Sequence, residues 1–320
     1  MRKAVVFAMV ALVGLMGVAS QAEAVAFLQG DIFASVSSGN VKHYRADGSF
    51  LETLNIGAGG FTTGMAFDSS GNLYVTGFSA STVAKFDTNG NSLGNFGAGY
   101  STPESIVFDN AGNAYVGNLG NGIRKYDGTG VFQNTVLNTR IDWMDLAADQ
   151  TTMLFTQEGN AIHTVNVNTG VQGADFASGY GGTNAFALRI LSDGGVLMAD
   201  RANVKRFDAA GNHIQTYDIA GEDSWFALNL NPDGTSFWSG NFNTANLYEF
   251  DIASGANTQI LNTGTGGNSL FGVGIFGEPT QGCKDCGGAE NPVIPEPSSI
   301  TLLGSGLFGL LAWSRKRILA

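Results

Sequence analysis

The chain has 320 residues, of which 46 are glycine and only 13% are charged, and its formal net charge is −11. Nucleic-acid binding needs clustered Lys and Arg, so this acidic, Lys-poor composition argues against a nucleic acid as partner. The region between the two termini has about 270 residues, enough for one large all-β domain or two ordinary domains.

The N-terminus has the features of a secretory signal peptide. Arg2 and Lys3 precede an apolar stretch over residues 4–19, which ends in the small-x-small pattern Ala22, Glu23, Ala24. Basic residues that stay in the cytosol, an apolar segment that enters the export machinery and small residues at the cleavage site define such a signal. We expect residues 1–24 to be removed by signal peptidase; a short N-terminal membrane anchor is the alternative.

A sequence repeat occupies the central region. A hydrophobic run ending in Asp, then a Gly-Asn turn and an aromatic strand, occurs at 64–75 (GMAFDSSGNLYV) and again at 105–116 (SIVFDNAGNAYV). Gly-Asn pairs between alternating hydrophobic residues indicate hairpins. A second marker, a strand end followed by a Gly turn, recurs at intervals of 40 to 43 residues. Its six positions are Tyr44, Phe86, Tyr126, Val167, Phe207 and Phe250.

A repeat of this length, with three or four short strands and no helical periodicity, is typical of a four-stranded propeller blade. A β-helix would have a much shorter repeat. The copies also resemble NHL-type propeller repeats, a family whose fold is the same. Inner strands are predicted near Met65, Ile106, Leu146, Leu188, Ala227 and Val273.

Blade number follows from the two ends of the repeat region. Residues 31–54 supply three strands without an inner strand, and residues 270–276 supply an inner strand without partners. Pairing of these two segments would close the ring and protect its sheet edges. The sequence therefore predicts an all-β fold, a six-bladed propeller over residues 25–277 with the N-terminal strands pairing with a C-terminal inner strand.

Propellers commonly act through the face that carries the loops entering each inner strand and the loops joining the second and third strands, so polar and aromatic residues there are candidates for a site. The candidate binding residues are Glu104, Asp142, Trp143, Asp145, Asn184, Asp200, Arg201 and Trp225. Acids, amides and Trp rings suit a sugar, and oxygen ligands suit Ca²⁺ or another divalent cation. No cofactor is expected, whether a metal binds stays open, and a role in turns alone is the alternative.

Catalysis finds less support in these residues. Six-bladed lactonases of the gluconolactonase family hold a divalent metal with acidic and Asn side chains, but no local motif here matches them beyond the blade. Propeller lyases of the streptogramin-inactivating type use a His near the channel, whereas His43, His163 and His213 fall in outer strands or turns. General base catalysis requires reach to the substrate, so we assign no catalytic residue.

Residues 278–294 form a Gly-rich segment that we expect to be a linker. It contains Cys283 and Cys286, the two cysteines of the chain. In an exported protein such a pair is expected to form a local disulfide; pairing between chains is the alternative.

The C-terminal segment, residues 295–320, has the motif Pro295, Glu296, Pro297, a Gly-rich and Leu-rich apolar stretch over 300–313, and a basic end at Arg315, Lys316 and Arg317. In this order the three parts resemble the PEP-CTERM sorting signal of Gram-negative bacteria that make exopolysaccharide. The apolar stretch is short for a lasting membrane span, and its basic end would stay cytoplasmic. The resemblance implies transient inner-membrane insertion as a short transmembrane helix, processing by an exosortase, and delivery to the envelope, cell surface or extracellular matrix.

Together these features predict an exported, non-catalytic binding or scaffold propeller whose partners are polysaccharide or envelope proteins. The alternative is an extracellular metal-dependent lactonase or lyase.

Overall fold

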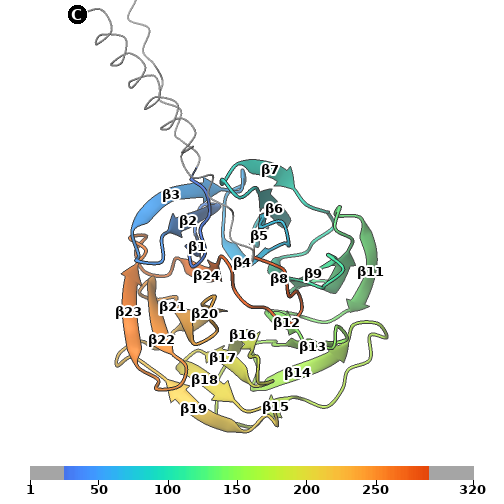
Figure 1. Cartoon of the computed structure of the whole chain (residues 1–320). Coiled ribbons are helices and arrows are strands. Elements are labelled where there is room, and N and C mark those ends of the chain that lie inside the picture. The colour runs from blue at the N-terminus through green and yellow to red at the C-terminus, as the bar shows by residue number, and fades with distance from the viewer. Residues whose placement is uncertain (1–24, 288–320) are drawn as a thin grey trace, which may run out of the picture.

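The computed structural model describes residues 25–287, which form a ring of six antiparallel sheets with four strands each (Figure 1). The predicted six-bladed all-β propeller is confirmed, and all six predicted inner strands occupy the innermost position of a sheet. The predicted signal peptide and sorting tail lie outside the described residues.

Each blade is described from its inner to its outer strand. The first complete blade is β4 (Thr62–Phe67), β5 (Leu73–Gly77), β6 (Thr82–Phe86) and β7 (Ser92–Asn95). The second is β8 (Pro103–Phe108), β9 (Ala114–Asn118), β10 (Gly122–Tyr126) and β11 (Phe132–Leu137). The third is β12 (Met144–Leu146), β13 (Thr152–Phe155), β14 (Ala161–Asn166) and β15 (Ala177–Ser178). The fourth is β16 (Ala185–Ile190), β17 (Val196–Asp200), β18 (Asn203–Phe207) and β19 (His213–Tyr217). The fifth is β20 (Trp225–Leu230), β21 (Ser236–Asn241), β22 (Asn246–Asp251) and β23 (Asn257–Asn262).

The closing blade joins the two ends of the propeller. Its inner strand β24 (Leu270–Ile275) pairs with β1 (Ile32–Val36), and β2 (Asn40–Tyr44) and β3 (Phe50–Asn55) complete the sheet. The register places Ile32 opposite Ile275 and Ala34 opposite Val273. This pairing confirms the predicted closure, and it leaves no inner strand without neighbours around the ring.

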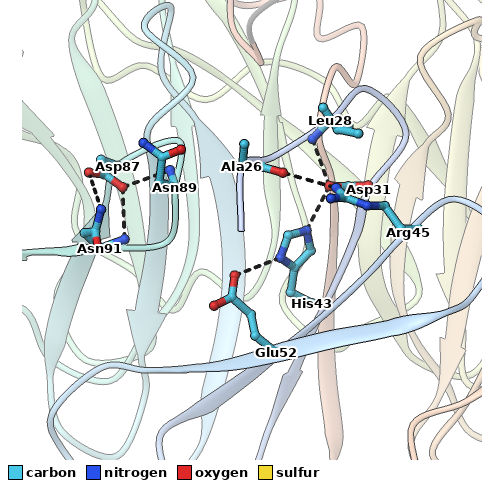
Figure 2. A network of polar contacts seen from close by, with 9 residues as sticks. All are labelled: Ala26, Leu28, Asp31, His43, Arg45, Glu52, Asp87, Asn89 and Asn91. Atoms are coloured by element: carbon cyan, nitrogen blue, oxygen red, sulfur yellow. Dashed lines mark hydrogen bonds and ion pairs between the residues drawn. The ribbon is translucent and has the colours of Figure 1, made fainter. Parts of the chain in front are cut away.

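A buried polar network stabilises the closing blade (Figure 2). His43 on β2 lies between two carboxylates, with Nε2 2.8 Å from Asp31 and Nδ1 3.1 Å from Glu52. Asp31 also accepts hydrogen bonds from Arg45 at 2.6 Å and from the Leu28 amide at 2.8 Å. Because the buried carboxylate is bonded by His43, Arg45 and a backbone amide, the network links the three N-terminal strands with its charge compensated.

The Asp of the repeat has a structural role in turns. Asp68 Oδ1 accepts the amide N–H groups of Ser70 and Asn72, each at 2.9 Å, and Gly71 has φ +78°. Asp87 makes the same contacts with Asn89 and Asn91 (Figure 2). An Asp that bonds its own backbone, followed by Gly at positive φ, is a stable turn, which explains why the pattern recurs.

The core lies between neighbouring blades, where aromatic side chains pack among aliphatic ones. Tyr74 on β5 packs against Phe108 on the next blade with ring centroids 4.9 Å apart, and Tyr217 on β19 packs against Phe237 on β21 at the same distance. Edge-to-face contacts of this kind add to the free energy gained by burial. One blade therefore packs on the next through aromatic side chains that recur along the sequence.

Residues 278–287, which we name the C-terminal strap, pack on the propeller although we expected a linker there. Figure 1 shows this red-orange segment crossing the centre of the ring. A Cβ on Gly282 would lie 2.8 Å from the carbonyl oxygen of Phe108, so the strap fits closely against the ends of β8 and β12. Cys283 and Cys286 form a disulfide within it, and both side chains are buried. The strap therefore closes one end of the channel, which we call the sealed end.

Candidate functional site

The opposite end of the channel, where the inner strands begin, is the open mouth. The second residue of five inner strands lies at this end, at Thr63, Glu104, Phe186, Phe226 and Phe271. On the third blade the shorter strand β12 starts at Met144, and Asp142 precedes it. A second set of residues directly follows the second strand of each blade, and the two sets together form the surface of the mouth.

Phenylalanine side chains cover one side of the mouth and line a cavity of about 590 Å³. The six residues, which we name the Phe arc, are Phe61, Phe78, Phe186, Phe226, Phe242 and Phe271. Successive ring centroids lie 4.7 Å apart for Phe186 and Phe226, 5.3 Å for Phe242 and Phe271, and 4.3 Å for Phe61 and Phe271. The cavity falls within the roughly 300–1,000 Å³ range of small-molecule sites.

Charged side chains from the second and third blades form the acidic arc of the mouth. Its members are Glu104, Arg140, Asp142 and Glu158. Arg140 lies 2.9 Å from Asp142 Oδ1 and 2.8 Å from Glu158 Oε1. The Arg140 guanidinium is therefore already shared between two carboxylates. The backbone of Glu158 has φ 56°, an unfavourable conformation for a residue with a Cβ.

Two acids of the acidic arc line the cavity, Glu104 and Glu158, and Glu104 is the more deeply buried of the two. Burial and the neighbouring Asp142 carboxyl raise the pKa of Glu104 well above its usual value; Glu158 adds to the rise and Arg140 opposes it. Burial also raises the pKa of Asp142, with Arg140 acting in the opposite direction. The raised pKa favours the protonated carboxyl of Glu104, which is able to share a hydrogen bond with Asp142 at the wall of the cavity.

Asn184 and Arg201 lie on the fourth blade, between the acidic arc and the Phe arc. Asp200 holds this part of the wall, because its Oδ1 accepts the amide N–H groups of Thr183 at 2.8 Å and Asn184 at 2.9 Å. Its Oδ2 lies 3.0 Å from Lys205 Nζ. Asp200 is buried, so the structure gives it a positioning role and leaves Asn184 and Arg201 at the cavity.

Of the eight candidate residues, Glu104, Asn184 and Arg201 line the cavity and Asp142 lies directly behind it. Trp143 and Trp225 do not line it; both are buried in the core beside the fourth and fifth blades, at 2% and 0% exposure. Neither ring is available to stack on a sugar at the mouth. Both residues lie at or near the start of an inner strand, as predicted, but their side chains point between blades and not into the channel.

Asp145 lies at the sealed end, away from Glu104. Its Oδ2 accepts the amide N–H of Ile190 at 2.9 Å, and burial raises the pKa of its carboxyl. Nearby, Glu278 of the strap lies 2.8 Å from Arg189 and accepts hydrogen bonds from Asn229 and the Leu230 amide. Asp145 therefore belongs to a buried network that attaches the strap.

Residues 25–287 contain no group of three or more His, Cys, Asp or Glu side chains arranged to hold a metal ion. The three histidines lie on β2, β14 and β19, and none lines the cavity of the mouth. Within the same residues no helix is long and apolar enough to cross a bilayer, and the predicted span at 300–313 lies outside them.

Sequence reasoning missed the Phe arc and Arg140. The signal was present, since the second residue of each inner strand can be read from the repeat once the strands are aligned. Phe186, Phe226 and Phe271 occupy that position in three consecutive blades. Because Phe also recurs at buried positions between blades, as at Phe86 and Phe207, its recurrence at the mouth was not separated from the core pattern.

Solved structures confirm the architecture. The chain is similar to one in a crystal structure of a nidogen/laminin complex, with a TM-score of 0.65, 13% identity, and coverage of 76% of this chain and 97% of that chain. It is also similar to the WD40 β-propeller domain of Doa1, with a TM-score of 0.55, 15% identity, and coverage of 76% and 81%. At such identities the likeness shows the fold alone. A comparison with curated proteins finds no sequence match.

Residues 293–317 match the PEP-CTERM protein-sorting motif, which confirms the resemblance seen in the C-terminal sequence. The motif identifies the class: an exported β-propeller protein that an exosortase processes on its way to the cell envelope or surface.

Proposed function

We propose that this protein is a non-catalytic binding or scaffold component of the cell envelope or extracellular matrix of a Gram-negative bacterium. Its propeller holds a polysaccharide or an envelope protein at the open mouth. The observation that supports this proposal is the two-sided cavity of about 590 Å³, with the Phe arc on one side and the acidic arc on the other. Specific sites combine such apolar surface with a few polar groups.

A saccharide fits both sides of this cavity. Its C–H faces stack on aromatic rings, and its hydroxyl groups take hydrogen bonds from amide and carboxyl groups. Asn184 and Glu104 supply such groups at the wall, and the rings of Phe61 and Phe271 supply the apolar face.

The test uses the exported protein purified from producing cells, on a glycan array and in pull-downs from extracellular polymer. Phe61 is 42% exposed at the mouth, so Phe61→Ala should weaken binding about tenfold without unfolding the chain. Phe50 on β3 is 55% exposed, away from the cavity, and Phe50→Ala is the matched control that keeps affinity unchanged. Absence of any ligand in both assays contradicts the proposal.

The second candidate is an extracellular metal-dependent lactonase or lyase. The raised pKa of Glu104 beside Asp142 favours it, because acids with perturbed pKa values gather in catalytic clefts. Metal analysis of the purified protein and assays on lactone and polyuronate substrates test this candidate. A protein that contains no metal and turns over neither substrate removes it.

A further inference from the structure

We infer that the open mouth selects saccharides that carry a carboxylate, with Arg201 binding the carboxylate of a uronic-acid residue. This inference rests on the proposed function and adds a ligand class to it. It depends on the position of Arg201, on its lack of a partner among residues 25–287, and on the other groups that line the cavity.

Arg201 directly follows β17 and lines the cavity at the junction of the two arcs. The equivalent position is Phe78 after β5, Leu119 after β9 and Phe242 after β21, so a guanidinium replaces an apolar side chain in this blade. In the two remaining blades the position is Ser37 after β1 and Thr156 after β13, so Arg201 is the charged residue of this set. The Arg201 side chain is exposed, so its guanidinium is solvated and gains a charge-assisted hydrogen bond when an anion binds it.

The part of the chain that the structure describes offers the Arg201 side chain neither an ion pair nor a hydrogen bond. Its backbone carbonyl accepts the Trp225 amide N–H at 2.9 Å, which fixes the residue at the rim while the side chain stays exposed. Arg140, the other cation of the cavity, is paired with Asp142 and Glu158. Among the described residues, the guanidinium that is available to a ligand in this cavity is therefore that of Arg201.

The groups around Arg201 favour a sugar acid over a fatty or aromatic acid. On one side lie Phe186 and Phe226, which offer ring faces to a pyranose. Elsewhere on the cavity wall lie Asn184 and the carboxyl of Glu104, which are able to hydrogen-bond to hydroxyl groups. An alkyl chain would make no hydrogen bond to these polar groups, which lowers its affinity relative to that of a sugar. A carboxylate on a hydroxylated ring satisfies all three surfaces.

The net charge of −11 makes the inference easier to test. A chain that is acidic overall repels polyanions at long range, so a preference for acidic saccharides would have to arise at a local site. Guanidinium–carboxylate pairs are charge-assisted and often bidentate, which makes Arg and Lys unequal at such a position.

The experiment is calorimetric titration of the exported protein with a trigalacturonate, with the same trisaccharide after reduction of its carboxyl groups, and with decanoate. We expect the acidic sugar to bind at least about tenfold more tightly than the reduced one. Arg201→Gln should bring both sugars to the same affinity, and Arg201→Lys should keep part of the difference. Lys284 is exposed on the strap at the sealed end, so Lys284→Gln removes the same charge as a control and should change nothing.

Each other outcome has a defined meaning. Equal binding of the two sugars that Arg201→Gln does not alter overturns the role of Arg201 and leaves the proposed function standing. Decanoate binding more tightly than the sugar acid, with dependence on Arg201, overturns the ligand class. If the array, the pull-down and the titrations all lack a ligand, the proposed function and this inference fail together.

Discussion

The two ends of the channel are made by the same six inner strands, yet they differ in whether their charged side chains have partners within the protein. At the sealed end, Glu278 is buried and receives Arg189, Asn229 and the Leu230 amide as partners, all from the chain itself. At the open mouth, Arg201 has no such partner within residues 25–287, and the rings of the Phe arc line the cavity. A structural network satisfies its own charges, whereas a binding surface leaves some for the ligand.

The largest expected effect comes from breaking the sealed end. Arg189→Ala removes the cation beside the buried carboxyls of Glu278 and Asp145, and should lower the free energy of unfolding by about 3–5 kcal/mol. The exposed pair of Arg206 and Asp193, 3.1 Å apart, is the control: Arg206→Ala should cost less than about 1 kcal/mol. Urea unfolding measures both. Equal losses in the two variants would show that the sealed end is not a buried network.

A smaller effect is expected from the disulfide of the strap. Replacing Cys283 and Cys286 with Ala should lower the free energy of unfolding by about 2 kcal/mol, because the closed loop is very short. Saccharide affinity at the open mouth should stay the same, since the disulfide lies at the other end of the channel. Chemical unfolding and titration of the variant measure the two quantities. A loss of affinity as large as the loss of stability would show that the two ends are coupled.

The smallest effect concerns pH and the open mouth. The pKa of Glu104 is raised above its value of 4.5 in the unfolded chain, so the folded state holds the proton more tightly. The stability that this provides is complete below about pH 4.5 and is lost as pH rises through the folded pKa, with a slope of at most about 1.4 kcal/mol per pH unit. Glu104→Gln should remove this part of the slope.

Thermal unfolding between pH 4 and 9 measures the slope, and Asp285→Asn, at an exposed acid of the strap, is the control that keeps it. A slope that is the same in wild type and Glu104→Gln would mean that Glu104 is ionised in the folded protein.

The sequence predicted the ring because its cues are local and repeated. Asp68 and Gly71 form a turn whatever surrounds them, and the same turn recurs along the chain. The ends of the repeat region then determined closure through β1 and β24. Blade number, inner strands and closure needed no knowledge of side-chain direction.

The site was predicted less well because it depends on that direction. Asp142 and Asp145 are three positions apart, and the short strand β12 sends them to opposite ends of the channel. Trp225 heads an inner strand as expected, but its ring lies in the core while that of Phe226 faces the cavity. The strap was missed because the burial of Glu278 depends on Arg189, which is 89 residues away. Pairings at such distances leave no local signal in a single sequence.

The strap also separates the sorting signal from the open mouth along the chain. Gly287, its last residue, donates its amide N–H to the carbonyl of Asp68 at 3.2 Å, in the turn after β4 at the sealed end. Whatever follows this point is joined to the pole of the ring opposite the cavity. Shortening, lengthening or replacing the sorting signal after Gly287 is therefore expected to change where the protein is delivered and to leave the cavity at the open mouth unchanged.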